Sequence, residues 1–229
     1  MIKSIIFDVD DTLYDFRSAH SAALGTLSAF VESVLGVSPE AFMALHGETF
    51  RLQEARLGNT AASHNRLIRF QMMLEALNKP VALAPAMAEL YWTALLACVR
   101  PLPGAMETLT RLRDRGMTIG VGTNMTADWQ FAKLQRLGMM PLIDFIVTSE
   151  EAGVEKPDAG LFALCARKAG CAMSECAFVG DSLKVDALGA RDAGMRAFWL
   201  YRGTDAPDAP QGVVRIRALT ELPALMDTQ

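Results

Sequence analysis

The carboxyl-terminal half of the chain alternates short apolar runs with amphipathic segments. The apolar runs are residues 118–124, 145–149, 176–181 and 196–201. The amphipathic segments each end at a glycine, namely Gly116, Gly138, Gly170 and Gly194. Because a glycine in the left-handed conformation commonly follows a helix, each segment predicts a helix that leads to or from a strand. The repetition predicts an α/β fold, a doubly wound parallel sheet with helices on both faces.

A further apolar run, residues 2–9, predicts a buried strand near the amino terminus. Its end carries three acids and a hydroxyl: Asp8, Asp10, Asp11 and Thr12. Unpaired charges are costly inside a protein, so these acids need a cation or a place beyond the strand's carboxyl end, where open α/β sheets bind ligands. Side chains alternate along a strand, so we expect Asp8 and Asp10 to point the same way. Such a pair can share a cation or divide the roles of nucleophile and proton carrier.

Residues 17–98 have a different pattern, with helical spacing and no convincing strand. Leu67, Phe70 and Leu74 recur at steps of three and four, as on one face of a helix. Two prolines and a glycine in residues 100–104 end this block and predict a linker. We therefore predict an inserted helical domain. The predicted domains are a core of residues 1–15 and 100–229 and a helical domain of residues 16–99.

Composition and charge narrow the classes of protein. The 229 residues are 51% hydrophobic and 21% charged, as in a soluble globular protein. A net charge of −4 offers no electrostatic footprint for a nucleic acid polymer or an anionic membrane. The most apolar stretch, residues 81–99, contains Pro85 and Glu89, so we expect a buried helix there and no membrane span. The four cysteines lack Cys-x-x-Cys spacing and are expected in the core, and the absence of a secretory pattern favours a cytoplasmic location.

Polar side chains follow the predicted strands in four clusters. They are Asp8, Asp10 and Thr12; Thr123 and Asn124; Lys156 and Asp158; and Asp181, Ser182 and Asp186. The carboxyl ends of neighbouring strands in a doubly wound sheet meet at one crevice. A crevice with acids, a lysine, a hydroxyl and backbone amides suits phosphoryl transfer, which depends on positioning and charge stabilisation. Mg²⁺ would hold such acids together, because it prefers oxygen ligands and also binds phosphate.

Each cluster taken alone also has a structural explanation. Asn124 and Asp181 could cap the helices that follow them, and Asp158 stands where an N-cap is expected. Lys156 and Asp186 could simply face water. The functional interpretation depends on the four clusters occurring together.

In their order along the chain, the four clusters resemble the motifs of the haloacid dehalogenase-like superfamily. The resemblance spans nearly the whole chain, and the helical insertion lies where part of the family carries a cap domain. It implies a Rossmann-like core and a phosphatase of the nucleotidase or sugar-phosphate type. Dehalogenases of the family usually lack an acid at the place of Asp10, so this residue favours phosphate ester hydrolysis over carbon–halogen cleavage.

The resemblance also implies a role for each residue. Asp8 would attack the phosphate monoester and form an aspartyl-phosphate, and Asp10 would protonate the leaving oxygen and then activate water. The implied phosphate-binding residues are Thr123, Asn124 and Lys156. The implied Mg²⁺ ligands are Asp8, the backbone carbonyl of Asp10, and Asp181, supported by Asp186, Thr12 and Ser182.

The expected substrate is a small phosphorylated metabolite, a nucleoside monophosphate or a sugar phosphate, bound by a monomer or homodimer. Two alternatives stay open: phosphoryl transfer to another hydroxyl, as in the family's mutases, and a phospho-acceptor or binding module without turnover. The inserted domain also carries basic side chains that could reach the substrate, although we first interpret its arginines as solvated. They are Arg51, Arg56, Arg66 and Arg69, with His20, His46 and His64.

Overall fold

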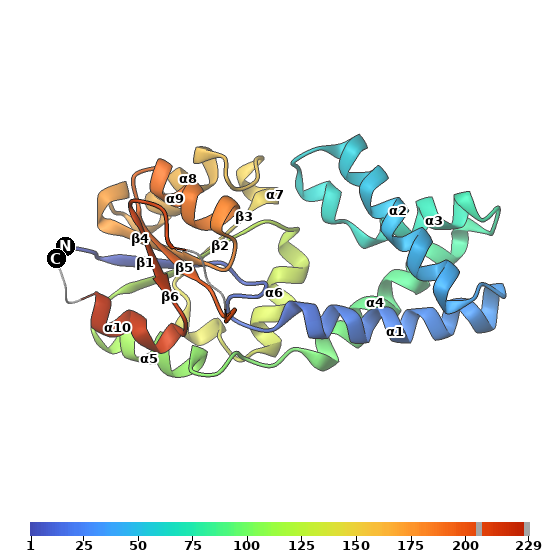
Figure 1. Cartoon of the computed structure of the whole chain (residues 1–229), viewed down its shortest axis with the longest axis horizontal. Coiled ribbons are helices and arrows are strands. Elements are labelled where there is room, and N and C mark those ends of the chain that lie inside the picture. The colour runs from blue at the N-terminus through green and yellow to red at the C-terminus, as the bar shows by residue number, and fades with distance from the viewer. Residues whose placement is uncertain (205–207, 227–229) are drawn as a thin grey trace. The chain divides into compact units, whose positions relative to one another are not determined.

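The structure is a computed structural model and describes residues 1–204 and 208–226 (Figure 1). The chain forms two compact units. The core unit consists of Met1–Asp15 and Arg100–Gln229, and the helical unit is Phe16–Val99. That the first is a catalytic core and the second its cap stays a prediction.

The core unit is built on one six-stranded sheet in the order β3-β2-β1-β4-β5-β6, and all of its neighbouring strands are parallel. The strands are β1 (Ser4–Phe7), β2 (Thr118–Thr123), β3 (Phe145–Thr148), β4 (Cys176–Gly180), β5 (Arg196–Leu200) and β6 (Val213–Ile216). The predicted parallel α/β sheet is confirmed. The four later predicted strands each end one residue before the predicted bound, β1 is shorter than the predicted run 2–9 at both ends, and the sixth strand was not predicted.

Helices cover both faces of this sheet. Figure 1 shows α8 (Ala159–Ala169) and α9 (Leu188–Asp192) on one side of it and α5 (Ala105–Asp114) and α10 (Leu222–Leu225) on the other. The remaining helices of the unit are α6 (Ala127–Arg136), α7 (Ser149–Ala152), a π-helical turn η5 (Leu183–Ala187), and the 3₁₀ turns η3 (Met140–Leu142), η4 (Met173–Glu175) and η6 (Leu219–Glu221). The four predicted helix-ending glycines all have a positive φ, between 64° and 91°, as this position requires.

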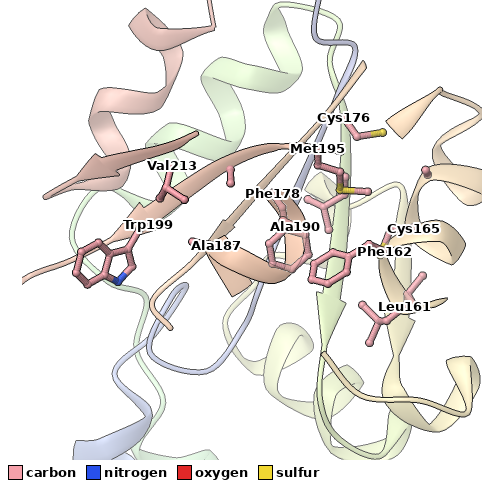
Figure 2. Close-up of a cluster of buried hydrophobic side chains, with 14 residues drawn as sticks. Leu161, Phe162, Cys165, Cys176, Phe178, Ala187, Ala190, Met195, Trp199 and Val213 are labelled. Atoms are coloured by element: carbon pink, nitrogen blue, oxygen red, sulfur yellow. The ribbon is translucent and has the colours of Figure 1, made fainter. Parts of the chain in front are cut away.

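A buried apolar cluster joins the sheet to α8 and α9 (Figure 2). Phe162 of α8 and Phe178 of β4 meet edge to face, with ring centroids 5.0 Å apart. Cys165 and Cys176 belong to this cluster, as expected for core thiols, whereas Cys98 is exposed and that expectation was wrong for it. The packing fixes the carboxyl ends of the central strands, where the polar clusters lie.

The helical unit contains α1 (Phe16–Leu35), α2 (Pro39–Leu57), α3 (Arg66–Ala76) and α4 (Ala84–Cys98), with the 3₁₀ turns η1 (Ala61–His64) and η2 (Val81–Leu83). All of residues 16–99 are described, and none forms a strand, as predicted. The apolar α4 packs against α1 and α3. The segment Val81–Cys98 is long and apolar enough to cross a membrane, judged by length and composition alone. Core helices of soluble proteins also meet this criterion.

Candidate active site

The strand order places β1 between β2 and β4, so three of the polar clusters follow adjacent strands. Phe7, the last residue of β1, pairs with Val121 on one side and Val179 on the other. The backbone N–H of Asp8 continues this ladder and donates to the Val179 carbonyl at 2.9 Å. The carboxyl ends of these strands therefore meet at the point where the strand order reverses, the usual ligand site of such sheets.

Lys156, in the loop before α8, joins two of the clusters. Its Nζ lies 2.7 Å from Asp8 Oδ1 and 2.7 Å from Asp186 Oδ1. The lysine side chain is 2% exposed, so the explanation that Lys156 faces water is wrong. Burial lowers the pKa of Lys156, but the charges of Asp186 and Asp8 outweigh it and raise the pKa above its ordinary value. Lys156 is therefore a permanently charged link between two buried carboxylates.

Asp8 carries a strongly perturbed carboxyl group. Burial raises the pKa of Asp8 to about 7, and the charges of Asp186 and Asp10 add to the rise while Lys156 opposes it. A further cation beside this carboxyl would restore its ionised form at neutral pH.

Backbone contacts hold the loop after β4 against the loop after β1. The N–H of Asp181 donates to Thr12 Oγ1 at 3.1 Å, and Trp199 Nε1 donates to the Asp181 carbonyl at 2.9 Å. Asp186 Oδ2 accepts from the Ser182 N–H at 3.0 Å, so Ser182 supports Asp186 through its backbone. Gly180 allows this approach, because a Cβ there would collide with the Asp186 side chain.

Three carboxylates converge in this region. Asp8, Asp181 and Asp186 each offer one oxygen, and these oxygens lie within 4.8 Å of one another. Lys156 contacts Asp8 and Asp186 of this cluster, and three carboxylate oxygens this close together suit a hard divalent cation. The residues therefore fit a metal site. Asp186 is a candidate ligand of that site and also forms an ion pair with Lys156.

Thr123 and Asn124 occupy different places at the end of β2. Thr123 is 1% exposed, and its hydroxyl accepts from Gln130 Nε2 at 2.8 Å. Asn124 clamps the backbone of Lys156, accepting from its N–H at 2.8 Å and donating to its carbonyl at 3.1 Å. The explanation of Asn124 as a helix cap is therefore wrong, because the N-cap position of α6 is Thr126.

Asp10 has a cation of its own that sequence analysis missed. Lys133 Nζ, on the buried face of α6, lies 2.7 Å and 3.0 Å from the two carboxylate oxygens. Tyr14 Oη donates to Asp10 Oδ1 at 2.5 Å, and Gln130 Nε2 donates to Oδ2 at 3.3 Å. Burial alone would raise the pKa of Asp10, but the charge and hydrogen bond of Lys133 outweigh it and lower the pKa.

The sequence alone does not reveal this contact, because it does not show which face of α6 is buried. Gln130, Lys133 and Leu134 lie three and four residues apart on one buried helical face. Buried polar side chains need partners, and for Gln130 and Lys133 the structure supplies Asp10. Asp8 and Asp10 have separate counter-ions, Lys156 and Lys133.

The remaining acids have structural roles. Asp158 caps α8, accepting from the Gly160 N–H at 2.8 Å, as predicted. Asp11 has a φ of 56° at the turn after Asp10, a conformation that aspartate tolerates better than most residues.

Known proteins are similar to this chain in sequence and in fold. Residues 2–194 match the haloacid dehalogenase-like hydrolase family. The ribulose-1,5-bisphosphate 5-phosphatase of Halopiger xanaduensis is 32% identical, covering 100% of this chain and 96% of its own. The glyceraldehyde 3-phosphate phosphatase of Methanopyrus kandleri is 34% identical over 89% of this chain and 85% of its own. The crystal structure of a HAD phosphatase from Thermococcus onnurineus shares the fold, with a TM-score of 0.77, 24% identity, and coverage of 100% and 99%.

The chain therefore belongs to the haloacid dehalogenase-like hydrolases and is an enzyme of the phosphatase type. These relatives act on small phosphorylated metabolites, and the predicted resemblance is confirmed at this level.

Proposed function

We propose that the protein is a Mg²⁺-dependent phosphomonoester hydrolase that acts on a small phosphorylated metabolite through an aspartyl-phosphate on Asp8. The observation that carries the proposal is the buried Asp8–Lys156–Asp186 array beside an independently paired Asp10. The named activities of the relatives favour sugar phosphates as the first class to test, ahead of nucleoside monophosphates.

Asp8 is the proposed nucleophile. Its carboxylate oxygen attacks phosphorus while the ester oxygen leaves, and Lys156 and Thr123 bind the phosphoryl oxygens. Asn124 fixes the backbone of Lys156 and so keeps the ammonium group in place. When bound by Asp8, Asp181 and the Asp10 carbonyl, with Asp186 close by, Mg²⁺ would neutralise charge on the transferring group.

Asp10 is the proposed proton carrier. It donates a proton to the leaving oxygen and then takes one from the water that hydrolyses the aspartyl-phosphate. In the free protein its low pKa favours the ionised form, which suits the second step. A phosphate dianion arriving beside Asp10 raises its pKa and so favours the protonated form that the first step needs.

The test is release of inorganic phosphate from a panel of sugar phosphates and nucleoside monophosphates, with Mg²⁺ and with EDTA. We expect Mg²⁺-dependent release that Asp8→Asn abolishes without loss of folding. Formation of an isomerised sugar phosphate would instead indicate a mutase. If no phosphoester is turned over, or Asp8→Asn keeps full activity, the proposal fails.

A further inference from the structure

The helical unit holds two buried arginines on α3. Arg66 is 6% exposed and Arg69 is 1% exposed, so our interpretation of them as solvated was wrong, whereas Arg51 and Arg56 are exposed as expected. Within residues 1–204 and 208–226, neither buried guanidinium has a carboxylate within ion-pair distance. Buried charges are normally paired, because desolvation of an unpaired charge is costly.

Arg69 is anchored by neutral groups. Its Nε donates to Gln53 Oε1 at 2.9 Å, and its Nη2 donates to the Ser63 carbonyl at 3.1 Å. The guanidinium also lies 4.6 Å from the centroid of the Phe50 ring. Burial, and after it the charge of Arg66, lower the pKa of Arg69 to about 9, while Tyr91 and Glu54 oppose the decrease.

Arg66 is less well satisfied. Its Nη1 donates to the His64 carbonyl at 2.8 Å, and its guanidinium lies 5.2 Å from the centroid of the Tyr91 ring. Its Nε–H is buried without a hydrogen-bond partner among the described atoms. Arg66 is also the first residue of α3, where the partial positive charge of the helix end is added to its own.

A second buried nitrogen without a hydrogen-bond partner among the described residues, His46 Nε2, lies among the aromatic side chains around Tyr91. Tyr91 Oη is 2.6 Å from His20 Nδ1, and the rings of His20 and His46 have centroids 5.8 Å apart. His46 is 7% exposed, and its Nε2 has no hydrogen-bond partner in the part of the chain described. Burial and the charges of Arg69 and Arg66 lower the pKa of His46 to about 3, so the ring is neutral and can donate one N–H.

We propose that Arg66 and His46 form an anion site inside the helical unit that takes a phosphate or carboxylate group. Guanidinium and imidazole N–H groups recognise such oxygens directly, and an anion would compensate the buried positive charge. The anion has two sources: a free ion from solution or a second acidic group on the substrate. The second source rests on the proposed function, whereas the site itself does not.

The first experiment measures thermal unfolding of the full-length protein in EDTA, with and without inorganic phosphate. The variants are Arg66→Met and, as a matched control, Arg56→Met on the exposed surface of α2. At about a hundredfold excess over Kd, a bound anion should raise Tm by about 5–10 °C. We expect the rise in Tm that is due to this site to be present in wild type and Arg56→Met and absent from Arg66→Met. Any phosphate bound at the candidate active site contributes equally to all three proteins.

Arg66→Met is expected to fold, because it removes an unpaired buried charge and keeps an apolar side chain of similar length. If it does not fold, Arg66→Lys provides the comparison, since it keeps a charge but loses the planar fork and should reduce the phosphate shift. A phosphate shift equal to that of wild type in both folded variants, or in Arg66→Lys alone if Arg66→Met does not fold, would overturn the site.

The second experiment identifies the source of the anion. If it is part of the substrate, Arg66→Met raises KM for a sugar bisphosphate about 10–100-fold and leaves KM for a monophosphate with a neutral remainder unchanged. If it is a free ion, both KM values stay near wild type while the Tm shift is still lost. Failure of all substrates to react would refute the proposed function, but the Tm comparison would still decide on the anion site.

Discussion

Asp8 and Asp10 differ by two positions in the chain and by their counter-ions. Asp8 shares Lys156 with Asp186, whereas Asp10 is held by Lys133, Tyr14 and Gln130. The alternation of side chains on a strand does not determine this difference, because both acids lie beyond the end of β1. Separate counter-ions suit the proposed mechanism, in which one acid reacts with phosphorus and the other transfers protons.

Asp10→Asn tests the proton-carrier role through the leaving group. An alkyl phosphate has a poor leaving oxygen that needs a proton, whereas p-nitrophenolate leaves without one. We expect kcat/KM to fall about 100–10,000-fold for an alkyl phosphate and far less for p-nitrophenyl phosphate. Steady-state assays of both esters provide the measurement, and equal losses on the two would argue against a proton transfer by Asp10.

Lys133 should couple energetically to Asp10. Lys133→Met leaves the Asp10 carboxylate without its main counter-ion, and we expect it to lower the free energy of unfolding by about 2 kcal/mol, since Asp10 is partly exposed. Adding Asp10→Asn should recover part of this loss, because the unpaired charge is then gone. Urea unfolding of the two single variants and the double variant measures the coupling. Additive effects would contradict a direct ion pair.

At the scale of elements, the hydrophobic pattern predicted most of the core unit. The strands from β1 to β5 and their helix-ending glycines follow from apolar runs and from positive-φ positions that glycine accepts. The sixth strand was missed because Arg215 interrupts its four residues, so the sequence shows no continuous apolar run there.

The candidate site was predictable only where residues cluster in the sequence. Asp8, Asp10 and Asp181 follow strand ends and could be located from the strand pattern. Lys133 could not, because its contact with Asp10 joins residues far apart in the chain and depends on which face of α6 is buried. The burial of Arg66 could not be predicted either, because it depends on the packing of α3 against α4 and on the contacts around Tyr91.

The helical unit should lose stability in acid through His46. Its pKa is about 3 in the folded protein and near 6.5 when unfolded, so the unfolded chain binds more protons between these values. The contribution of His46 to the free energy of unfolding is therefore present above pH 6.5 and is lost as the pH drops toward 3. Between pH 8 and pH 5 this loss amounts to about 2 kcal/mol.

The measurement for this prediction is urea unfolding of wild type and His46→Gln across that range. His46→Gln should remove the His46 contribution to the slope, because glutamine does not titrate. An unchanged slope in the variant would show that His46 is not the titrating group.

At the scale of the whole molecule, the carboxylate cluster predicts stabilisation by a divalent cation. Mg²⁺ at about a hundredfold excess over its Kd should raise Tm of the EDTA-treated protein by about 5–10 °C. Asp181→Asn, which removes one charged oxygen of the cluster, should lose most of that rise. Differential scanning calorimetry checks both. Equal shifts in wild type and Asp181→Asn would place the cation elsewhere.

The central claim is a covalent phosphoryl group on Asp8, and trapping it is the most direct test. A reacting mixture is quenched in acid and reduced with borohydride, which converts a phosphorylated aspartate to homoserine, and peptide mass spectrometry then locates the change. We expect homoserine at position 8, in amounts that follow the turnover of substrate, and none without substrate. Rapid phosphate release with an unmodified Asp8, or with the change at another acid, would contradict the mechanism.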